Sequence, residues 1–128
     1  MNVLSREPRM SDGKTIGEYV TFEDGAKLYL HHYSGEKNRN LIMKHNAWAL
    51  PTRVIREAER LGCAMIGIRH KVGKKLFVYM VRIQDFLDAP SEIHYAQGKE
   101  PMRRLNRNRF TVSTTKTEGY IESRLKIR

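Results

Sequence analysis

The sequence predicts an α/β or α+β domain in which a mixed sheet is covered by at least one helix. Three observations indicate this class. Side chains alternate on both sides of Asp24-Gly25, as in a β-hairpin; apolar residues between Pro51 and Gly62 recur at helical spacing; and two nearly continuous apolar runs follow, at 63–68 and 76–83. The chain of 128 residues has the length of one domain with one core.

The N-terminal part of the chain is divided by its polar segments. Residues 1–14 are polar and show no periodicity, so we expect a flexible segment there. In the hairpin that follows, Asp24-Gly25 is predicted to form a two-residue turn with positive φ angles. The polar residues 34–40 are expected to be a loop, and the run 41–43 is a candidate for a third, short strand.

A helix is predicted next. Pro51 suits a first helical turn, and Gly62 suits the left-handed position after the last one. The expected buried stripe consists of Leu50, Val54, Ala58 and Leu61. A separate helix face carries Arg53, Arg56 and Arg60.

Beyond the helix, strands are expected at 63–70 and 75–83, joined by a basic turn, and a short helix or turn before Pro90. Residues 109–115 alternate as a strand does, and the rest of the tail is compatible with strand or helix. These patterns divide the chain into a flexible segment 1–14, an α/β core 15–90 and a basic C-terminal extension 91–128.

Charge is the most informative property of the composition. The net charge is +10, from 24 Lys and Arg against 14 Asp and Glu. Residues 51–83 and 97–128 each carry +6, and the stretch 84–96 between them carries −3. Two concentrated basic blocks favour a polyanionic partner, and we expect nucleic acid.

Several classes of protein are disfavoured. No apolar run approaches the roughly 20 residues of a membrane helix, and no secretory signal is expected at the N-terminus. The single cysteine, Cys63, suits a reducing, intracellular compartment, so a cytoplasmic location is expected. The glycines form neither a dinucleotide fingerprint nor a P-loop, and no Cys/His pairs have zinc spacing.

The histidines form a first candidate for catalytic chemistry. The order His31-His32, Asn40, His45-Asn46 resembles a degenerate His-Asn-His finger nuclease. In such a nuclease a histidine activates water, an asparagine orients it and a further ligand holds a divalent metal. The alternative is that these are surface and hairpin-edge histidines.

A longer resemblance covers residues 18–88. The features that carry it are Trp48 near a helix start, Glu57-Ala58 and Gly62 towards the helix end, the two apolar strands, and Asp85-Phe86-Leu87. In this order they resemble the second half of Holliday-junction-resolvase-like nucleases of the PD-(D/E)XK superfamily. The resemblance implies a restriction-endonuclease-like mixed sheet and, for an active member, an acidic residue and a Glu-x-Lys motif around Mg²⁺ or Mn²⁺.

The chain departs from this family where the chemistry is expected. Glu18 or Asp24 could provide the first acid, but no Glu-x-Lys triplet occurs in the sequence. The corresponding strand instead carries His31 and His32. Glu18, Asp24, His31 and His32 are therefore the candidate catalytic residues, and a binding protein on a nuclease-like scaffold is favoured over an active nuclease.

Candidate binding residues follow from the two basic blocks. Arginine matches phosphate oxygens with two parallel hydrogen bonds, and aromatic rings such as Phe77, Tyr79 and Phe110 stack on bases when they are not part of the core. The predicted phosphate-binding residues are Arg53, Arg56, Arg60, Arg69, Lys71, Lys74, Lys75, Arg103, Arg104, Arg107 and Arg109.

Three functions are compatible with these observations. The first is a nucleic-acid-binding protein, with DNA favoured over RNA. The second is a divalent-metal endonuclease or junction resolvase that uses Mg²⁺ or Mn²⁺, and the third is a protein inhibitor or adaptor with basic faces. A homodimer is compatible with each, and compactness suggests a phage or mobile-element origin.

Overall fold

The computed structural model describes residues 3–33, 47–72, 75–89, 92–93 and 100–115. A six-stranded sheet has the order β1-β2-β3-β5-β6-β9, in which β3 and β5 are parallel and the other neighbours are antiparallel. Its strands are β1 (Val3–Ser11), β2 (Lys14–Phe22), β3 (Lys27–Tyr33), β5 (Met65–Val72), β6 (Lys75–Arg82) and β9 (Thr111–Thr115).

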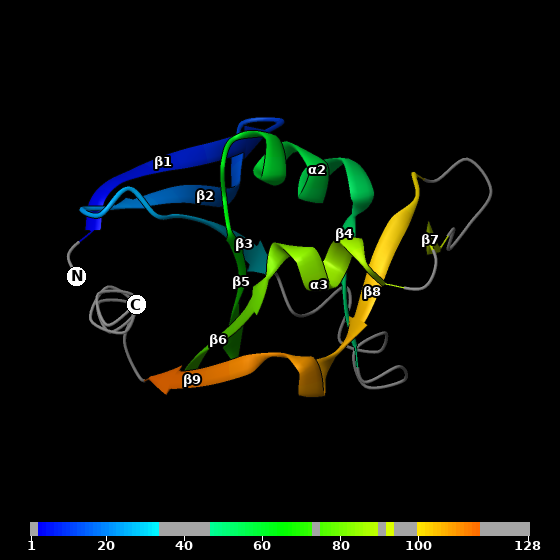
Figure 1. Cartoon of the computed structure of the whole chain (residues 1–128). Coiled ribbons are helices and arrows are strands. Elements are labelled where there is room, and N and C mark those ends of the chain that lie inside the picture. The colour runs from blue at the N-terminus through cyan, green and yellow to red at the C-terminus, as the bar shows by residue number, and fades with distance from the viewer. Residues whose placement is uncertain (1–2, 34–46, 73–74, 90–91, 94–99, 116–128) are drawn as a thin grey trace.

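A smaller three-stranded sheet has the order β4-β8-β7, with both pairs antiparallel. The remaining elements are β4 (Ala47–Pro51), α2 (Thr52–Arg60), α3 (Ile83–Leu87), β7 (Glu92–Ile93), β8 (Met102–Asn106) and the 3₁₀ turn η1 (Arg107–Arg109). In Figure 1 the helices and the small sheet lie together on one side, and the β1–β2 hairpin extends to the other. The predicted class is confirmed: the fold is mixed α/β, mostly sheet, with few helices.

The large sheet begins earlier than predicted. Residues 1–14 were expected to be a flexible segment, but β1 pairs with β2 over most of its length. The two strands are joined at Asp12-Gly13, where both residues have positive φ angles, 51° and 75°. These angles are those of a two-residue hairpin turn, so this Asp-Gly pair has the conformation that was expected of Asp24-Gly25.

The β2–β3 connection is a longer turn. Phe22 N–H donates to the Ala26 carbonyl at 2.8 Å, so Glu23, Asp24 and Gly25 form the loop. Gly25 alone has a positive φ in this loop, and the Asp24 carboxylate accepts a hydrogen bond from Ala26 N–H at 2.9 Å. The predicted hairpin is confirmed, but the two-residue form of its turn is wrong.

Helix α2 ends as predicted. Gly62 has a φ of 88°; its N–H donates to the Glu59 carbonyl, and Cys63 N–H donates to the Ala58 carbonyl. This pair of bonds is a Schellman motif, which satisfies two carbonyls at the helix end. The predicted stripe is partly wrong: Leu50 belongs to β4 and Leu61 is 46 % exposed, while the buried helix residues are Val54, Ile55 and Ala58.

The described C-terminal residues 100–115 belong to the two sheets and not to a separate extension, contrary to the predicted boundary at residue 90. β9 pairs with β6 as an edge strand of the large sheet, and β8 pairs with β4. The short helix before Pro90 and the strand near 111–115 are confirmed. The candidate strand 41–43 lies outside the described residues. No helix in the described part of the chain is both long and apolar enough to cross a membrane.

The large sheet buries a different core on each face. On the face that carries both helices and the small sheet, here the helix face, Tyr29, Ile66, Ile68 and Tyr79 pack against the helices and β4. On the opposite face, here the rear face, the core is Val20, Phe22, Leu28, Leu30, Leu76, Val78 and Met80.

Candidate nucleic-acid interface

Three of the predicted phosphate-binding arginines lie on the outer side of α2. Because Val54, Ile55 and Ala58 point into the core, helical periodicity turns Arg53, Arg56 and Arg60 to solvent. Arg53 is ion-paired with Glu100, and Arg56 Nη1 lies 3.7 Å from Glu59 Oε1. Both arginine side chains remain more than half exposed, at 63 % and 56 %.

A second group of arginines surrounds Asp85 on α3. Arg109 Nη2 lies 3.2 Å from Asp85 Oδ1, and Arg82 Nε lies 3.7 Å from Asp85 Oδ2. The side chains of Arg109 and Arg82 are 54 % and 75 % exposed. Arg109 is positioned by η1, where the Asn106 side chain accepts a hydrogen bond from Asn108 N–H at 3.0 Å. One carboxylate therefore faces two exposed guanidinium groups.

The C-terminal arginine block does not act as one surface. Arg103 Nη1 donates to the carbonyls of Leu87 and Ala89, at 3.0 and 2.9 Å, and so holds the end of α3. Arg104 projects from the other side of β8 and is half-buried. Of the four predicted residues in this block, Arg103 has a structural role, and Arg109 is the most open to a phosphate.

Arg107 belongs to an aromatic cluster. Its guanidinium lies 5.7 Å from the Trp48 ring centroid and 5.4 Å from that of Tyr79, within cation–π range. Arg107 Nη2 also donates to the Tyr79 hydroxyl at 2.9 Å. Of the predicted stacking residues, Tyr79 and Phe110 are buried core, and Phe77 is half-buried.

The predicted basic turn lies at the carboxyl end of β5. Lys71 is exposed on the rear face, and Arg69, on the same face, is half-buried and lies beside His32 of β3 in the parallel register. Burial lowers the pKa of Arg69. Lys74 lies outside the described residues, and only the backbone of Lys75 is described.

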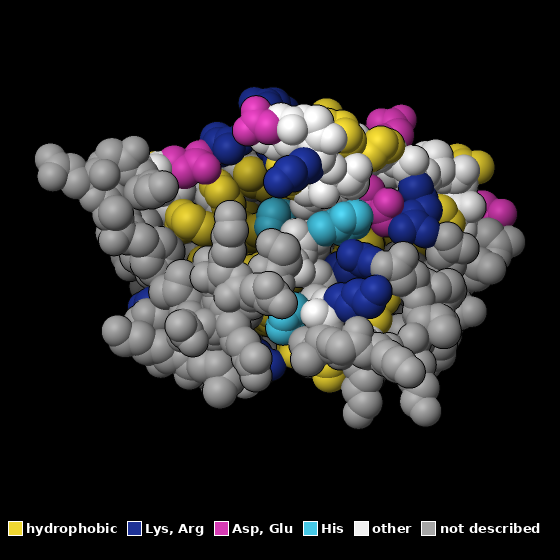
Figure 2. All heavy atoms as spheres, turned by 180° about the vertical axis from the view of Figure 1, so that it is seen from behind, with side chains coloured by type: hydrophobic (Ala, Val, Ile, Leu, Met, Phe, Trp, Pro, Cys, Tyr) yellow, Lys and Arg dark blue, Asp and Glu magenta, His cyan; other side chains and the backbone are white. Residues whose placement is uncertain are grey.

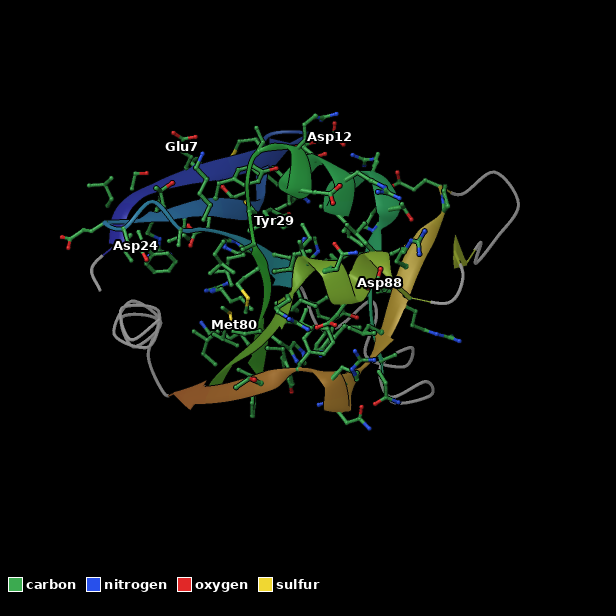
Figure 3. All side chains as sticks on the ribbon, in the orientation of Figure 1. Glu7, Asp12, Asp24, Tyr29, Met80 and Asp88 are labelled. Atoms are coloured by element: carbon green, nitrogen blue, oxygen red, sulfur yellow. The ribbon has the colours of Figure 1, made fainter. Side chains whose placement is uncertain are left out.

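The four candidate catalytic residues do not form one site. Strand alternation places Glu18 and His32 on the rear face and His31 on the helix face. Asp24 lies in the β2–β3 turn, before β3 begins at Lys27, and His31 lies four residues, about 13 Å at roughly 3.3 Å per residue, along the strand from Lys27. Figure 3 shows Asp24 at the tip of the hairpin, away from Tyr29 at the centre. Among the described residues, no group of three or more His, Cys, Asp or Glu side chains could hold a metal ion.

Glu18 and His32 are nevertheless close to two arginines. Arg6 Nε donates to Glu18 Oε1 at 3.0 Å, and burial and the charge of Arg69 lower the pKa of His32, an effect that the Glu18 charge opposes. His32 Nε2 is buried without a hydrogen-bond partner among the described residues. Figure 2 shows the described histidines close to Lys and Arg side chains in the middle of the molecule seen from behind.

Sequence reasoning missed a polar network on the helix face. The Tyr19 hydroxyl donates to Glu57 Oε1 at 2.6 Å, and Arg9 Nε donates to the same oxygen at 3.3 Å. These two bonds, the one from Tyr19 first, lower the pKa of Glu57. Arg9 was overlooked because its strand was predicted to be flexible.

A second pair continues this network into the sheet. The Tyr29 hydroxyl and His31 Nδ1 lie 3.0 Å apart, and the Tyr19 and Tyr29 rings are 5.1 Å apart. Burial, followed by the charges of His32 and Arg9, lowers the pKa of His31 to about 4, so the imidazole is neutral at pH 7. Gly17 makes room for Tyr29, because a Cβ there would lie 2.5 Å from the hydroxyl.

The function is inferred from these geometric observations, because comparisons with known proteins give no relative from which it could be transferred. A scan against protein-family models, a search of curated proteins and a search of solved structures found no match to this chain.

Proposed function

We propose that the protein binds nucleic acid, DNA in preference to RNA, by neutralising backbone phosphates with the exposed arginines of the helix side. The observation that carries this proposal is the exposure of Arg53, Arg56, Arg82 and Arg109, whose side chains are all 54 % to 75 % exposed. We refer to these four residues, together with Arg60, as the arginine face.

The ion pairs of the arginine face contribute little to folding. Exposed pairs stabilise a protein by at most about 1 kcal/mol, because water screens the charges and two long side chains must be ordered. A phosphate can therefore replace a carboxylate partner at little cost. Residues 34–128 carry 20 basic and nine acidic residues, so a polyanion gains from the excess of positive charge in this part of the chain.

We further propose that the scaffold is restriction-endonuclease-like, and the order of the elements supports this. β3 is followed by Trp48, then by α2 with its glycine stop, and then by the antiparallel strands β5 and β6. Because β3 and β5 are parallel neighbours, α2 is part of the crossover that joins them. This is the element order on which the resemblance to PD-(D/E)XK nucleases depends. The missing Glu-x-Lys motif favours binding over cleavage.

The proposal is tested by salt-dependent binding. Single-stranded, duplex and four-way DNA and matched RNA are titrated in a gel-shift panel at 50 and 200 mM salt. If six or more phosphates are neutralised, affinity is expected to fall by about a thousandfold or more over this range. Lys14→Ala, an exposed cation beside the β1–β2 turn, is the matched control and is expected to bind as the wild type does. A salt-independent affinity contradicts the proposal, and an absence of binding to any nucleic acid at low salt favours a protein partner.

A second candidate function is phosphodiester cleavage on the rear face. Glu18 and His32 are close to Arg6 and Arg69. In this arrangement His32 would act as the general base beside the Glu18 carboxylate, and the two arginines would bind the phosphate. Incubation of the same substrates with Mg²⁺ or Mn²⁺ tests it. Cleavage that His32→Ala and Glu18→Gln both remove supports the second function, and products that persist in both variants exclude this site.

A further inference from the structure

We infer that the protein binds single-stranded nucleic acid by stacking unpaired bases on Tyr33, His70 and Phe77, here the aromatic row. The inference rests on the proposed function and adds which form of nucleic acid is preferred. Tyr33 and Phe77 are both register partners of His70, so the three side chains lie side by side across β3, β5 and β6.

Among the residues that the structure describes, the aromatic row lies where the cover of the helix face ends. The neighbouring pair on the same face is Ile68 of β5 and Tyr79 of β6. These two side chains lie beneath the small sheet and η1 and are only 1 % and 5 % exposed. His70 and Phe77, two residues further along, are half-buried, as is Tyr33. Partly exposed aromatic side chains on three adjacent strands provide a platform on which successive bases can stack whatever their sequence.

The three rings of the row are held in place by contacts with the buried rings of Trp48 and Tyr79. The Trp48 ring contacts Tyr33 and His70 edge to face, with centroids 4.7 and 5.3 Å away, and the Tyr33 and His70 rings meet edge to face at 5.4 Å. The Phe77 ring stacks against Tyr79, with centroids 6.3 Å apart. Since each ring is fixed by its neighbours, little conformational entropy is lost when a base binds.

The charges around the aromatic row suit a polyanion. Arg107 lies over the rings of Trp48 and Tyr79. Burial, followed by the charge of Arg107, lowers the pKa of His70 from its ordinary value of 6.5, so this ring is neutral and available for stacking at pH 7.

Trp48 provides the readout, because it is the only tryptophan and lies against two members of the row. The wild-type protein is titrated with a deoxythymidine oligonucleotide, with an abasic deoxyribose-phosphate oligomer of equal length, and with the corresponding duplex. We expect the oligonucleotide to quench Trp48 fluorescence and to bind at least about fivefold more tightly than the abasic oligomer, as expected for one stacked base. The duplex is expected to leave the fluorescence unchanged.

Two variants assign the effect to the row. Tyr33→Leu and Phe77→Leu keep an apolar side chain and lose the ring, and each is expected to lower affinity for the oligonucleotide by about fivefold to a hundredfold while leaving the abasic oligomer unaffected. Arg56→Ala is the matched control, because it is expected to weaken both ligands equally. Circular dichroism and thermal unfolding establish that each variant is folded.

The outcomes separate the two proposals. Equal affinity of the wild type for both oligomers, without quenching, overturns the base-stacking inference and leaves phosphate binding intact. If neither oligomer binds at low salt, the proposed function itself fails. Since these comparisons use the wild type, a variant that does not fold leaves the inference testable.

Discussion

The two faces of the six-stranded sheet are built from different kinds of residue. The rear-face core consists of aliphatic side chains with Phe22, none more than 5 % exposed. The helix face carries tyrosines, the Arg9–Glu57–Tyr19 and Tyr29–His31 bonds, and the Trp48 cluster.

The difference indicates how the domain separates stability from recognition. Aliphatic packing depends on buried area and shape, so the rear face contributes mainly to folding. Hydrogen-bonded aromatic side chains contribute stability too, but they also orient polar atoms and ring faces. The helix face has this composition, and the aromatic row and the three arginines of α2 lie on that side of the sheet.

The largest effect is expected from shortening a rear-face side chain. Leu30 is fully buried and packs over Gly67, where a Cβ would lie 2.9 Å from Leu30 Cδ1. Leu30→Ala is expected to lower the free energy of unfolding by about 2–5 kcal/mol, because apolar contacts are lost and a cavity remains. Urea unfolding measures the change. Leu4→Ala, at a position 67 % exposed, is the control and is expected to change stability by less than about 0.5 kcal/mol.

The helix face is expected to give the protein its pH dependence. The pKa of His31 is about 4 in the folded protein against 6.5 for an ordinary histidine. Below pH 6.5 the unfolded chain binds a proton that the folded protein excludes, so stability is complete above pH 6.5 and is lost as the pH falls towards 4, by up to about 3 kcal/mol.

Unfolding of wild type and His31→Gln at pH 7.5 and 4.5 isolates this contribution, because His32 and His70, whose pKa values are also lowered, remain in both proteins. The variant is expected to lose less stability on acidification, whereas Leu30→Ala keeps the wild-type dependence. The same acid sensitivity in His31→Gln would exclude His31 as its source.

Local signals account for the parts of the fold that were predicted. The hairpin, α2 with its Gly62 stop, β5 and β6 follow from periodicity and turn residues close to each other in sequence. β1 was missed because VLSREPRMS has little apolar alternation and lies at the edge of the sheet. Asp12-Gly13 was the available turn signal, and it was overlooked in favour of Asp24-Gly25.

Less of the candidate site could be predicted from the sequence, because strand pairing between distant parts of the chain determines which residues come together there. Exposure of Arg53 and Arg56 could be predicted from the helix period. The role of Arg103 at the end of α3, and the contact of Arg107 with Trp48, depend on β8 pairing with β4, which local patterns do not indicate. The alignment of Tyr33, His70 and Phe77 likewise depends on the register of three strands.

A smaller effect is expected from one hydroxyl of the helix face. Tyr19→Phe removes the 2.6 Å bond to Glu57 and is expected to lower the free energy of unfolding by about 1 kcal/mol. In a double-mutant cycle, Tyr19→Phe is expected to cost less in a Glu57→Ala background, since the partner is already absent. Equal costs in both backgrounds would show that this bond does not couple β2 to α2.

The smallest effect on stability is expected on the arginine face. Arg56→Ala removes an exposed ion pair with Glu59, so the free energy of unfolding should change by less than about 0.5 kcal/mol. The slope of log affinity against log salt should nevertheless become shallower by about 0.9 for duplex DNA, the contribution of one phosphate. Leu30→Ala, measured where it is folded, should leave that slope unchanged. An unchanged slope in Arg56→Ala together with a shallower slope in Leu30→Ala would place the phosphate contacts elsewhere. Phosphate binding would then depend on rear-face packing and not on the charge of α2.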